Sequence, residues 1–250
     1  MPKQLDLMKL REARIGELLS TAQKKSKDFS TPPLIVIGGY ALRAQVPFAR
    51  YSRDCDFAIP KQPDAWAIDK IPKWFPELST ESKEKKERSG YLRLIQALVA
   101  GKNRIKVSLD FMEGEVVDRS EERIQIDDSF VSRSITAPIK VAGEEIEIRV
   151  PAYEDYLLLK LLSARPSDVR DIAALIWRNG TPDASSLITR AREIVSNPVH
   201  IGTNLGMVIK EVSDPRFIDS WRGTFISEAF SEADKKRVIA ALKKMRTEFG

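Results

Sequence analysis

Two carboxylates flank a cysteine in the segment RYSRDCDFAIP, residues 50–60, whose apolar side chains predict a β-strand that Pro60 ends. Side chains alternate between the two faces of a strand, so Asp54 and Asp56 are expected on one face and Cys55 on the other. Carboxylates this close repel each other unless a cation lies between them. Because hard divalent cations prefer oxygen ligands, the pair could hold Mg²⁺ or Mn²⁺. The alternative is a solvated strand end with two surface acids.

A pair of glycines precedes this strand. The run LIVIGG, residues 34–39, predicts a short buried strand that stops at Gly38 and Gly39, and residues 40–45 are expected to begin a helix. Glycine lets backbone N–H groups approach a ligand closely, and a helix N-terminus attracts an anion. The pair is therefore a candidate phosphate-binding turn, and the alternative is a tight strand-to-helix turn without a ligand.

A third acid lies in the apolar run KVSLDFME, residues 106–113. Asp110 stands between Leu109 and Phe111 and is expected in the middle of a strand, where a lone acid needs a partner. If this strand lies beside the Asp54 strand, three carboxylates converge. They could then hold two divalent ions, the arrangement that supports an in-line phosphoryl displacement. The alternative for Asp110 is a salt-bridged sheet residue.

The order of these features resembles the DNA polymerase β-like nucleotidyltransferase superfamily. The segment GGYALRAQVPFARYSRDCDF, residues 38–57, is similar to its AbiEii-type abortive-infection toxin branch, which carries GG-x-A-L and then Arg-x-Ser/Thr-x-Asp-apolar-Asp. The resemblance covers about residues 34–176. The matching positions are Gly38, Gly39, Ala41, Leu42, Arg50, Ser52, Asp54 and Asp56.

A second match supports the resemblance. The branch carries a helical lysine followed by an Arg-Asp pair, for which this sequence offers Lys160 and then Arg170 and Asp171. The branch often has a further acid three residues after that pair, where this sequence has Ala174. Asp168, which lies upstream, is the acid that could take its place.

The resemblance implies a role for each matching residue. Asp54 and Asp56 would bind Mg²⁺ on the nucleotide phosphates, and Asp110 would complete the second ion and help to activate the acceptor hydroxyl. These catalytic and metal-binding residues are Asp54, Asp56 and Asp110. The nucleotide-binding residues would be Gly38, Gly39, Arg50, Ser52, Lys160 and Asp171. The alternatives are that Arg50 and Ser52 fix the metal loop, that Lys160 is a solvated or snorkelling helix lysine, and that Asp171 forms a helix-surface pair with Arg170.

The activity that the resemblance implies is metal-dependent transfer of a nucleoside monophosphate from an NTP to a hydroxyl acceptor. The acceptor would be RNA, such as the 3′ end of a tRNA, or protein, and the chain would be the toxin that an antitoxin protein counteracts. One alternative is an inactive nucleotidyltransferase fold that binds nucleic acid or a partner. Another is an enzyme that modifies small molecules such as antibiotics.

Composition narrows the class of protein. The chain has 250 residues, a net charge of +5 and a pI of about 9.2, which is compatible with nucleotide or nucleic-acid partners. A single cysteine and a single histidine exclude an intrachain disulfide framework and a typical structural zinc site. The single cysteine also suits a reducing cytoplasm, where we expect the protein to act. No segment is apolar and long enough to cross a membrane, so we expect no membrane partner.

The expected fold class is α/β (α+β), with a small mixed sheet of the nucleotidyltransferase fold flanked by helices. Residues 1–150 would form the catalytic domain with an N-terminal helix, and residues 151–250 a helical domain. Residues 129–151 are expected to contain a β-hairpin with an Ala-Gly turn, and residues 83–90 a charged loop or helix end. Asp183 and Ser231 are expected as helix N-caps, and His200 is expected in a loop.

Overall fold

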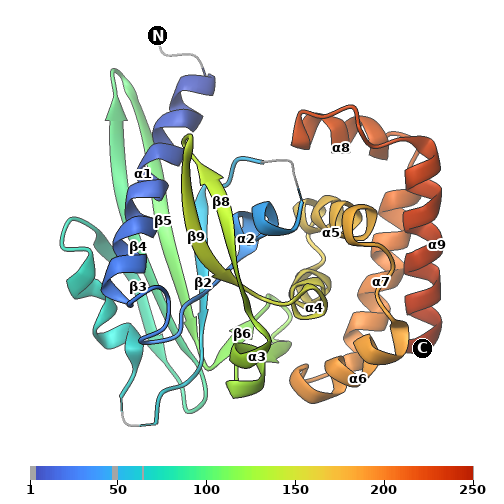
Figure 1. Cartoon of the computed structure of the whole chain (residues 1–250), viewed down its shortest axis with the longest axis horizontal. Helices are drawn as coiled ribbons and strands as arrows, with labels where there is room; N and C mark the ends of the chain where they lie inside the picture. The colour runs from blue at the N-terminus through green and yellow to red at the C-terminus, as the bar shows by residue number, and fades with distance from the viewer. Residues whose placement is uncertain (1–3, 47–49, 64, 250) are drawn as a thin grey trace. The chain divides into compact units, whose positions relative to one another are not determined.

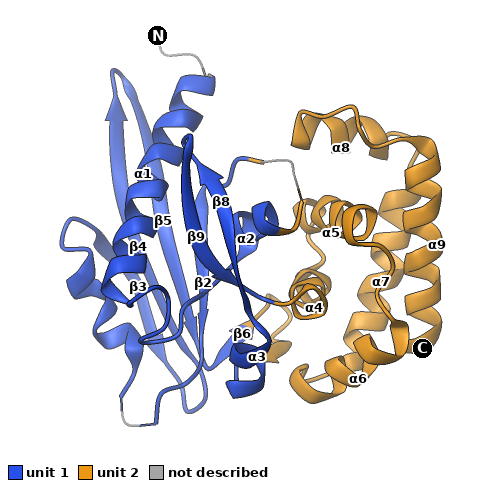
Figure 2. Ribbon diagram, viewed as in Figure 1, with its two compact units in different colours: residues 1–44, 51–116, 126–151 blue, residues 45–50, 117–125, 152–250 orange. Residues whose placement is uncertain are grey.

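The computed structural model describes residues 4–46, 50–63 and 65–249, and the chain divides into two compact units (Figure 2). The sheet unit comprises residues 1–44, 51–116 and 126–151. The helical unit comprises residues 45–50, 117–125 and 152–250. The sequence predicts one boundary, near residue 150, and the independence of two domains stays a prediction.

A five-stranded mixed sheet is the centre of the sheet unit (Figure 1). Only the β2–β5 pair is parallel in this sheet, and the parallel register places Asp56 directly beside Asp110. The predicted α/β class, with a small mixed sheet and flanking helices, is confirmed. The strand order is β1 (Ile35–Ile37), β2 (Asp54–Ile59), β5 (Asn103–Glu113), β4 (Gly90–Ala100) and β3 (Ser79–Lys85).

Apolar burial explains why these segments form a sheet core. Every residue of β1 is buried, and the rings of Phe57 in β2 and Phe111 in β5 stack with their centroids 4.8 Å apart. Helix α1 (Gln4–Lys25) packs against β5. Its Ile15 and Leu18 are fully buried or nearly so, as their helical spacing predicts.

The predicted hairpin is confirmed. Ala142 and Gly143 join its two strands, and both have positive φ values, 52° and 89°, as a two-residue turn of the favoured hairpin type requires. The hairpin strands are β8 (Ile135–Val141) and β9 (Glu144–Val150). The other elements before residue 152 are α2 (Gly38–Gln45), η1 (Ala67–Asp69), η2 (Ile71–Trp74), β6 (Glu115–Val117), β7 (Arg123–Gln125) and α3 (Asp128–Arg133).

The charged run at residues 83–90 differs from expectation, because its first three residues belong to the edge strand β3. Charged and polar side chains occupy both faces of this strand, so it lacks the alternation that predicts a strand. Such charge is typical of edge strands, since it discourages pairing with another chain. The register of β3 shifts between Thr80 and Ser82, which leaves Glu81 at a β-bulge.

Helices make up the helical unit after Pro151. Asp183 caps its helix by accepting a hydrogen bond from the Ser186 N–H, and Ser231 caps the last helix by accepting one from the Asp234 N–H, so both predicted N-caps are confirmed. His200 lies in helix α7, so its expected place in a loop is wrong. The helices are α4 (Tyr153–Ser163), α5 (Pro166–Asn179), α6 (Ala184–Ile194), α7 (Pro198–Ser213), α8 (Phe217–Phe225) and α9 (Glu232–Phe249).

Within the described ranges, each helix is either too short or too polar to cross a lipid bilayer.

Candidate active site

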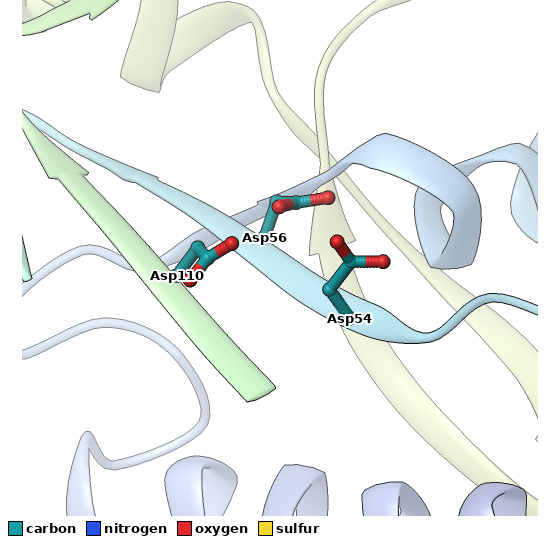
Figure 3. Close-up of side chains that lie close together, drawn as sticks. All are labelled: Asp54, Asp56 and Asp110. Atoms are coloured by element: carbon teal, nitrogen blue, oxygen red, sulfur yellow. The ribbon is translucent and has the colours of Figure 1, made fainter. Parts of the chain in front are cut away.

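Three carboxylates from two neighbouring strands converge on one face of the sheet (Figure 3). Asp54 and Asp56 come from β2 and Asp110 comes from β5, and one carboxylate oxygen of each lies within 4.8 Å of the others. Asp54 and Asp56 are partly exposed, whereas Asp110 is 7% exposed. The predicted convergence is confirmed, and we call these residues the acidic triad.

Strand alternation and strand pairing together build the acidic triad. Alternation in β2 sends Asp54 and Asp56 to one face and leaves Cys55 fully buried on the other. Burial also raises the pKa of the Cys55 thiol well above its usual value, so Cys55 is a neutral core side chain. The parallel register of β2 and β5 then brings Asp110 beside Asp56.

The acidic triad fits a divalent cation. Its donor set consists of carboxylate oxygens alone, which suits Mg²⁺ or Mn²⁺ better than a soft metal. In addition, Oδ1 of Asp110 is buried and makes no hydrogen bond with any group in the described part of the chain. A buried carboxylate oxygen without a hydrogen bond is costly, and a bound cation would remove that cost.

The surroundings of Asp110 shift its pKa in opposite directions. Burial raises the pKa of Asp110 to about 6, and the Asp54 carboxylate adds to this rise. The Arg93 guanidinium and a hydrogen bond with Tyr91 act in the opposite direction. Asp110 is therefore much easier to protonate than an exposed aspartate, and a nearby cation would favour its ionised form.

The acidic triad has two charged neighbours that sequence reasoning missed. Arg93 in β4 lies with Nε 3.2 Å from Asp110 Oδ1 and 3.3 Å from Glu81 Oε2. No local pattern could have found them, because both residues reach the site through the order of the strands and the bulge in β3.

Position 38 requires glycine because Asp56 of the acidic triad lies too close for a side chain there. Gly38 begins helix α2 with φ of +70°, and a Cβ at this position would lie 2.0 Å from Asp56 Oδ2. The carboxylate of Asp56 thus packs directly against the glycine backbone at a helix N-terminus, where negative charge is favoured. The neighbouring Gly39 is buried within the same helix. Binding of phosphate by Gly38 and Gly39 stays a prediction.

Replacing Gly38 by Ala is expected to displace Asp56 and weaken Mn²⁺ binding about tenfold or more, measured by calorimetric titration without nucleotide. Gly101→Ala is the matched control. Gly101 also has a positive φ, +61°, but no atom lies within 4 Å of its would-be Cβ. Both variants carry similar backbone strain, so equal loss of Mn²⁺ affinity in the two would contradict the close contact of Gly38 with Asp56.

Ser52 touches a member of the acidic triad. Its hydroxyl donates a hydrogen bond of 3.4 Å to Oδ1 of Asp54. This contact agrees with a role in fixing the metal loop, which is one of the two roles predicted for Ser52. Contact between Ser52 and nucleotide phosphate stays a prediction.

The remaining predicted nucleotide-binding residues contact one another in the helical unit, and we call them, with Asp168, the ionic cluster. Arg50 donates hydrogen bonds of 2.7 and 2.6 Å to the two carboxylate oxygens of Asp171. Lys160 lies 2.9 Å from Asp171 and 3.0 Å from Asp168. Asp171 is 0% exposed and Lys160 is 4% exposed. Lys160 is therefore neither solvated nor snorkelling, and Asp171 does not form the surface pair with Arg170.

Opposite charges keep Lys160 and Asp168 ionised in spite of their burial. Burial by itself would lower the pKa of Lys160, but Asp171 and Asp168 outweigh it and raise that pKa above its usual value. Burial would likewise raise the pKa of Asp168, but Lys160 and Arg165 hold it well below its usual range. Asp168 is thus the second acid that contacts Lys160. Its substitution for the acid that the family often has at the position of Ala174 stays a prediction. Nucleotide contacts of the ionic cluster stay predictions.

Comparisons with known proteins identify the family of this chain. Residues 22–241 match the family described as nucleotidyl transferase AbiEii toxin of type IV toxin–antitoxin systems. A candidate nucleotidyltransferase from H. pylori is similar in structure, with 11% identity, a TM-score of 0.47 and coverage of 96% of this chain and 95% of that chain. JHP933 from Helicobacter pylori has 13% identity, a TM-score of 0.43 and coverage of 96% and 91%. The comparison with curated proteins gave no match. Because the family match spans most of its length, the chain belongs to the AbiEii family of nucleotidyltransferase toxins.

Proposed function

We propose that this chain transfers a nucleoside monophosphate from an NTP to a hydroxyl acceptor and releases pyrophosphate. The observation that carries the proposal is the convergence of Asp54, Asp56 and Asp110 within 4.8 Å on one sheet face. Membership of a toxin family of type IV toxin–antitoxin systems supports the same class of activity and implies an antitoxin in the biological system.

In this proposal the acidic triad holds one or two divalent cations, Mg²⁺ or Mn²⁺. Asp54 and Asp56 would hold the cation that binds the nucleotide phosphates, and Asp110 would complete the second cation site and help to activate the acceptor hydroxyl. Bound cations would neutralise charge on the phosphates and on the attacking oxygen. Backbone N–H groups of Gly38 and Gly39 are assigned to the triphosphate.

We also propose that Arg50, Lys160 and Asp171 bind the nucleotide. Their existing ion pairs limit how they can do so. The charges of Arg50 and Lys160 are already balanced by Asp171 and Asp168. Direct contact with a triphosphate therefore requires Lys160 to exchange a carboxylate for a phosphate oxygen. If the nucleotide binds without this exchange, the role of the ionic cluster is structural.

The acceptor class that we propose is RNA, such as the 3′ end of a tRNA, with a protein hydroxyl as the other possibility, in a cytoplasmic setting. Two different functions compete with it. An inactive fold would bind RNA or a partner protein without transfer, and a small-molecule enzyme would modify compounds such as antibiotics. The intact acidic triad argues against the first of these, and a screen of acceptors separates the second.

The test is incubation of the protein with Mg²⁺ or Mn²⁺, each of the four α-labelled NTPs, and total bacterial RNA or protein. We expect label in one macromolecular fraction and loss of that label when EDTA removes the cation. RNA binding without label under every metal and NTP would contradict the enzyme and favour the binding module. Label only in small molecules would favour the antibiotic-type alternative.

A further inference from the structure

Arg93 is a basic residue of the sheet unit that contacts Asp110, the buried member of the acidic triad. It stands directly opposite Asp110 in the antiparallel register of β4 and β5. Its Nε lies 3.2 Å from Asp110 Oδ1, yet the two atoms are not aligned for a hydrogen bond. Both atoms are buried and have no hydrogen-bond partner in the described ranges. This donor and this acceptor therefore form an ion pair without a hydrogen bond, next to a candidate metal site.

Glu81 is the second carboxylate that contacts the Arg93 guanidinium. The β-bulge in β3 directs Glu81 toward Arg93, at 3.3 Å, and toward Lys106, also at 3.3 Å. Glu81, Arg93 and Asp110 therefore form a charged row across three adjacent strands. Because the Glu81 side chain is partly exposed, this contact orients the guanidinium rather than supplying much stability.

The strand order places Arg93 and Gly38 on opposite sides of the acidic triad. Gly38 directly follows β1, which pairs with β2 on the side away from β5. Arg93 belongs to β4, which pairs with β5 on the side away from β2. If Gly38 receives the triphosphate, as proposed above, the reacting acceptor must approach the acidic triad from another direction. Arg93, whose buried Nε makes no hydrogen bond in the described part of the chain, lies on the side of the acidic triad away from Gly38.

We propose that Arg93 binds the acceptor, its guanidinium donating to a phosphate oxygen next to the reacting hydroxyl while Glu81 keeps it in place. This inference rests on the proposed function and assigns its acceptor side. A guanidinium suits a phosphate group because its planar N–H donors match the phosphate oxygens. A cation bound at Asp110 would satisfy the carboxylate oxygen that makes no hydrogen bond. The Arg93 side chain is 35% exposed, so its terminal N–H groups would donate to the acceptor phosphate while Nε stays between Asp110 and Glu81.

The first arm of the test compares KM values for two substrates. Arg93→Gln is expected to raise KM for total bacterial RNA about tenfold and to leave KM for the NTP within about twofold, since one charged hydrogen bond to the acceptor is lost. Arg93→Lys keeps the charge and should recover part of the RNA affinity. Arg216→Gln is the matched control, because Arg216 is an exposed arginine of the helical unit.

The second arm measures Mn²⁺ binding to the nucleotide-free protein at pH 8. Arg93→Gln removes a cation that lies beside Asp110, so it should bind Mn²⁺ about threefold or more tightly than the wild type. Arg93→Lys should stay near the wild-type value. A merely structural role for Arg93 would weaken Mn²⁺ binding and lower the melting temperature instead.

The outcomes separate this inference from the proposed function. A wild type that labels RNA while Arg93→Gln keeps its KM for RNA, or raises only its KM for the NTP, would overturn the acceptor role alone. A wild type that labels only protein would overturn the phosphate contact. A wild type that transfers no label at all would contradict the proposed function and the acceptor role together, and unchanged Mn²⁺ affinity in Arg93→Gln would then also reject the charge coupling to Asp110.

Discussion

Replacing Asp56 by Asn is expected to lower the rate of label transfer by at least about 10³-fold while leaving the fold intact. Asp56 belongs to the acidic triad and packs directly against Gly38. The amide keeps the shape of the side chain but removes the negative charge that holds a cation, and a catalytic cation is worth several kcal/mol in the transition state. Initial rates with the labelled NTP measure the loss, and circular dichroism checks the fold. Asp54→Asn is expected to behave in the same way.

Asp69→Asn is the matched control for charge removal from the sheet unit. Asp69 pairs with Lys83 and Lys85 at the surface and lies outside the acidic triad. The label-transfer rate of Asp69→Asn should stay within about twofold of the wild-type rate, because an exposed ion pair contributes little to stability. Full transfer activity in Asp56→Asn would contradict the proposed site.

In cells, expression of the wild type should slow growth and Asp56→Asn should relieve this effect, whereas equal growth would remove support for toxicity through transfer.

Replacing Asp171 by Ala is expected to lower the free energy of unfolding by about 3–5 kcal/mol. The substitution leaves Arg50 and Lys160 facing each other in a buried site after both lose their shared carboxylate. Removing one partner of a buried ion pair costs more than the pair itself contributes, because an uncompensated charge remains. Chemical denaturation followed by fluorescence measures the change.

Glu193→Ala provides the comparison for this stability experiment. Glu193 pairs with Arg190 in the same unit, but its side chain is 57% exposed, so its removal should cost less than about 1 kcal/mol. The free energy of unfolding of Asp171→Ala could instead equal that of Glu193→Ala while nucleotide affinity alone is lost. The ionic cluster would then be a binding element rather than a structural one. Loss of both stability and nucleotide affinity would indicate that the same contacts serve both purposes.

The two variants act on different parts of the chain and are expected to have different signatures. Asp56→Asn removes charge from a partly exposed site and should abolish chemistry with little change in stability. Asp171→Ala removes charge from a fully buried site and should reduce stability first. This contrast follows from burial, since a charge that water can reach needs no protein partner to remain ionised.

Local patterns in the sequence were sufficient for much of the fold. Period-two alternation around Asp54 and Asp56 put both carboxylates on one strand face, and the turn at Ala142 and Gly143 predicted the hairpin. The caps at Asp183 and Ser231 followed from side-chain chemistry within four residues. These features depend on neighbours along the chain, so they can be inferred before the tertiary structure is known. The edge strand β3 could not be inferred, because its charges hide the alternation.

The sequence by itself determined that acids at positions 54, 56 and 110 lie on strands near a glycine turn, and it carried the family resemblance. Only the tertiary structure decided the parallel register that sets Asp110 beside Asp56 and the contacts of Arg93 with Asp110 and Glu81. It also decided the pairing of Arg50 with Asp171 across 121 positions. The physical reason is that strand order and register result from burial summed over the whole sheet, whereas alternation and capping are properties of a few consecutive residues.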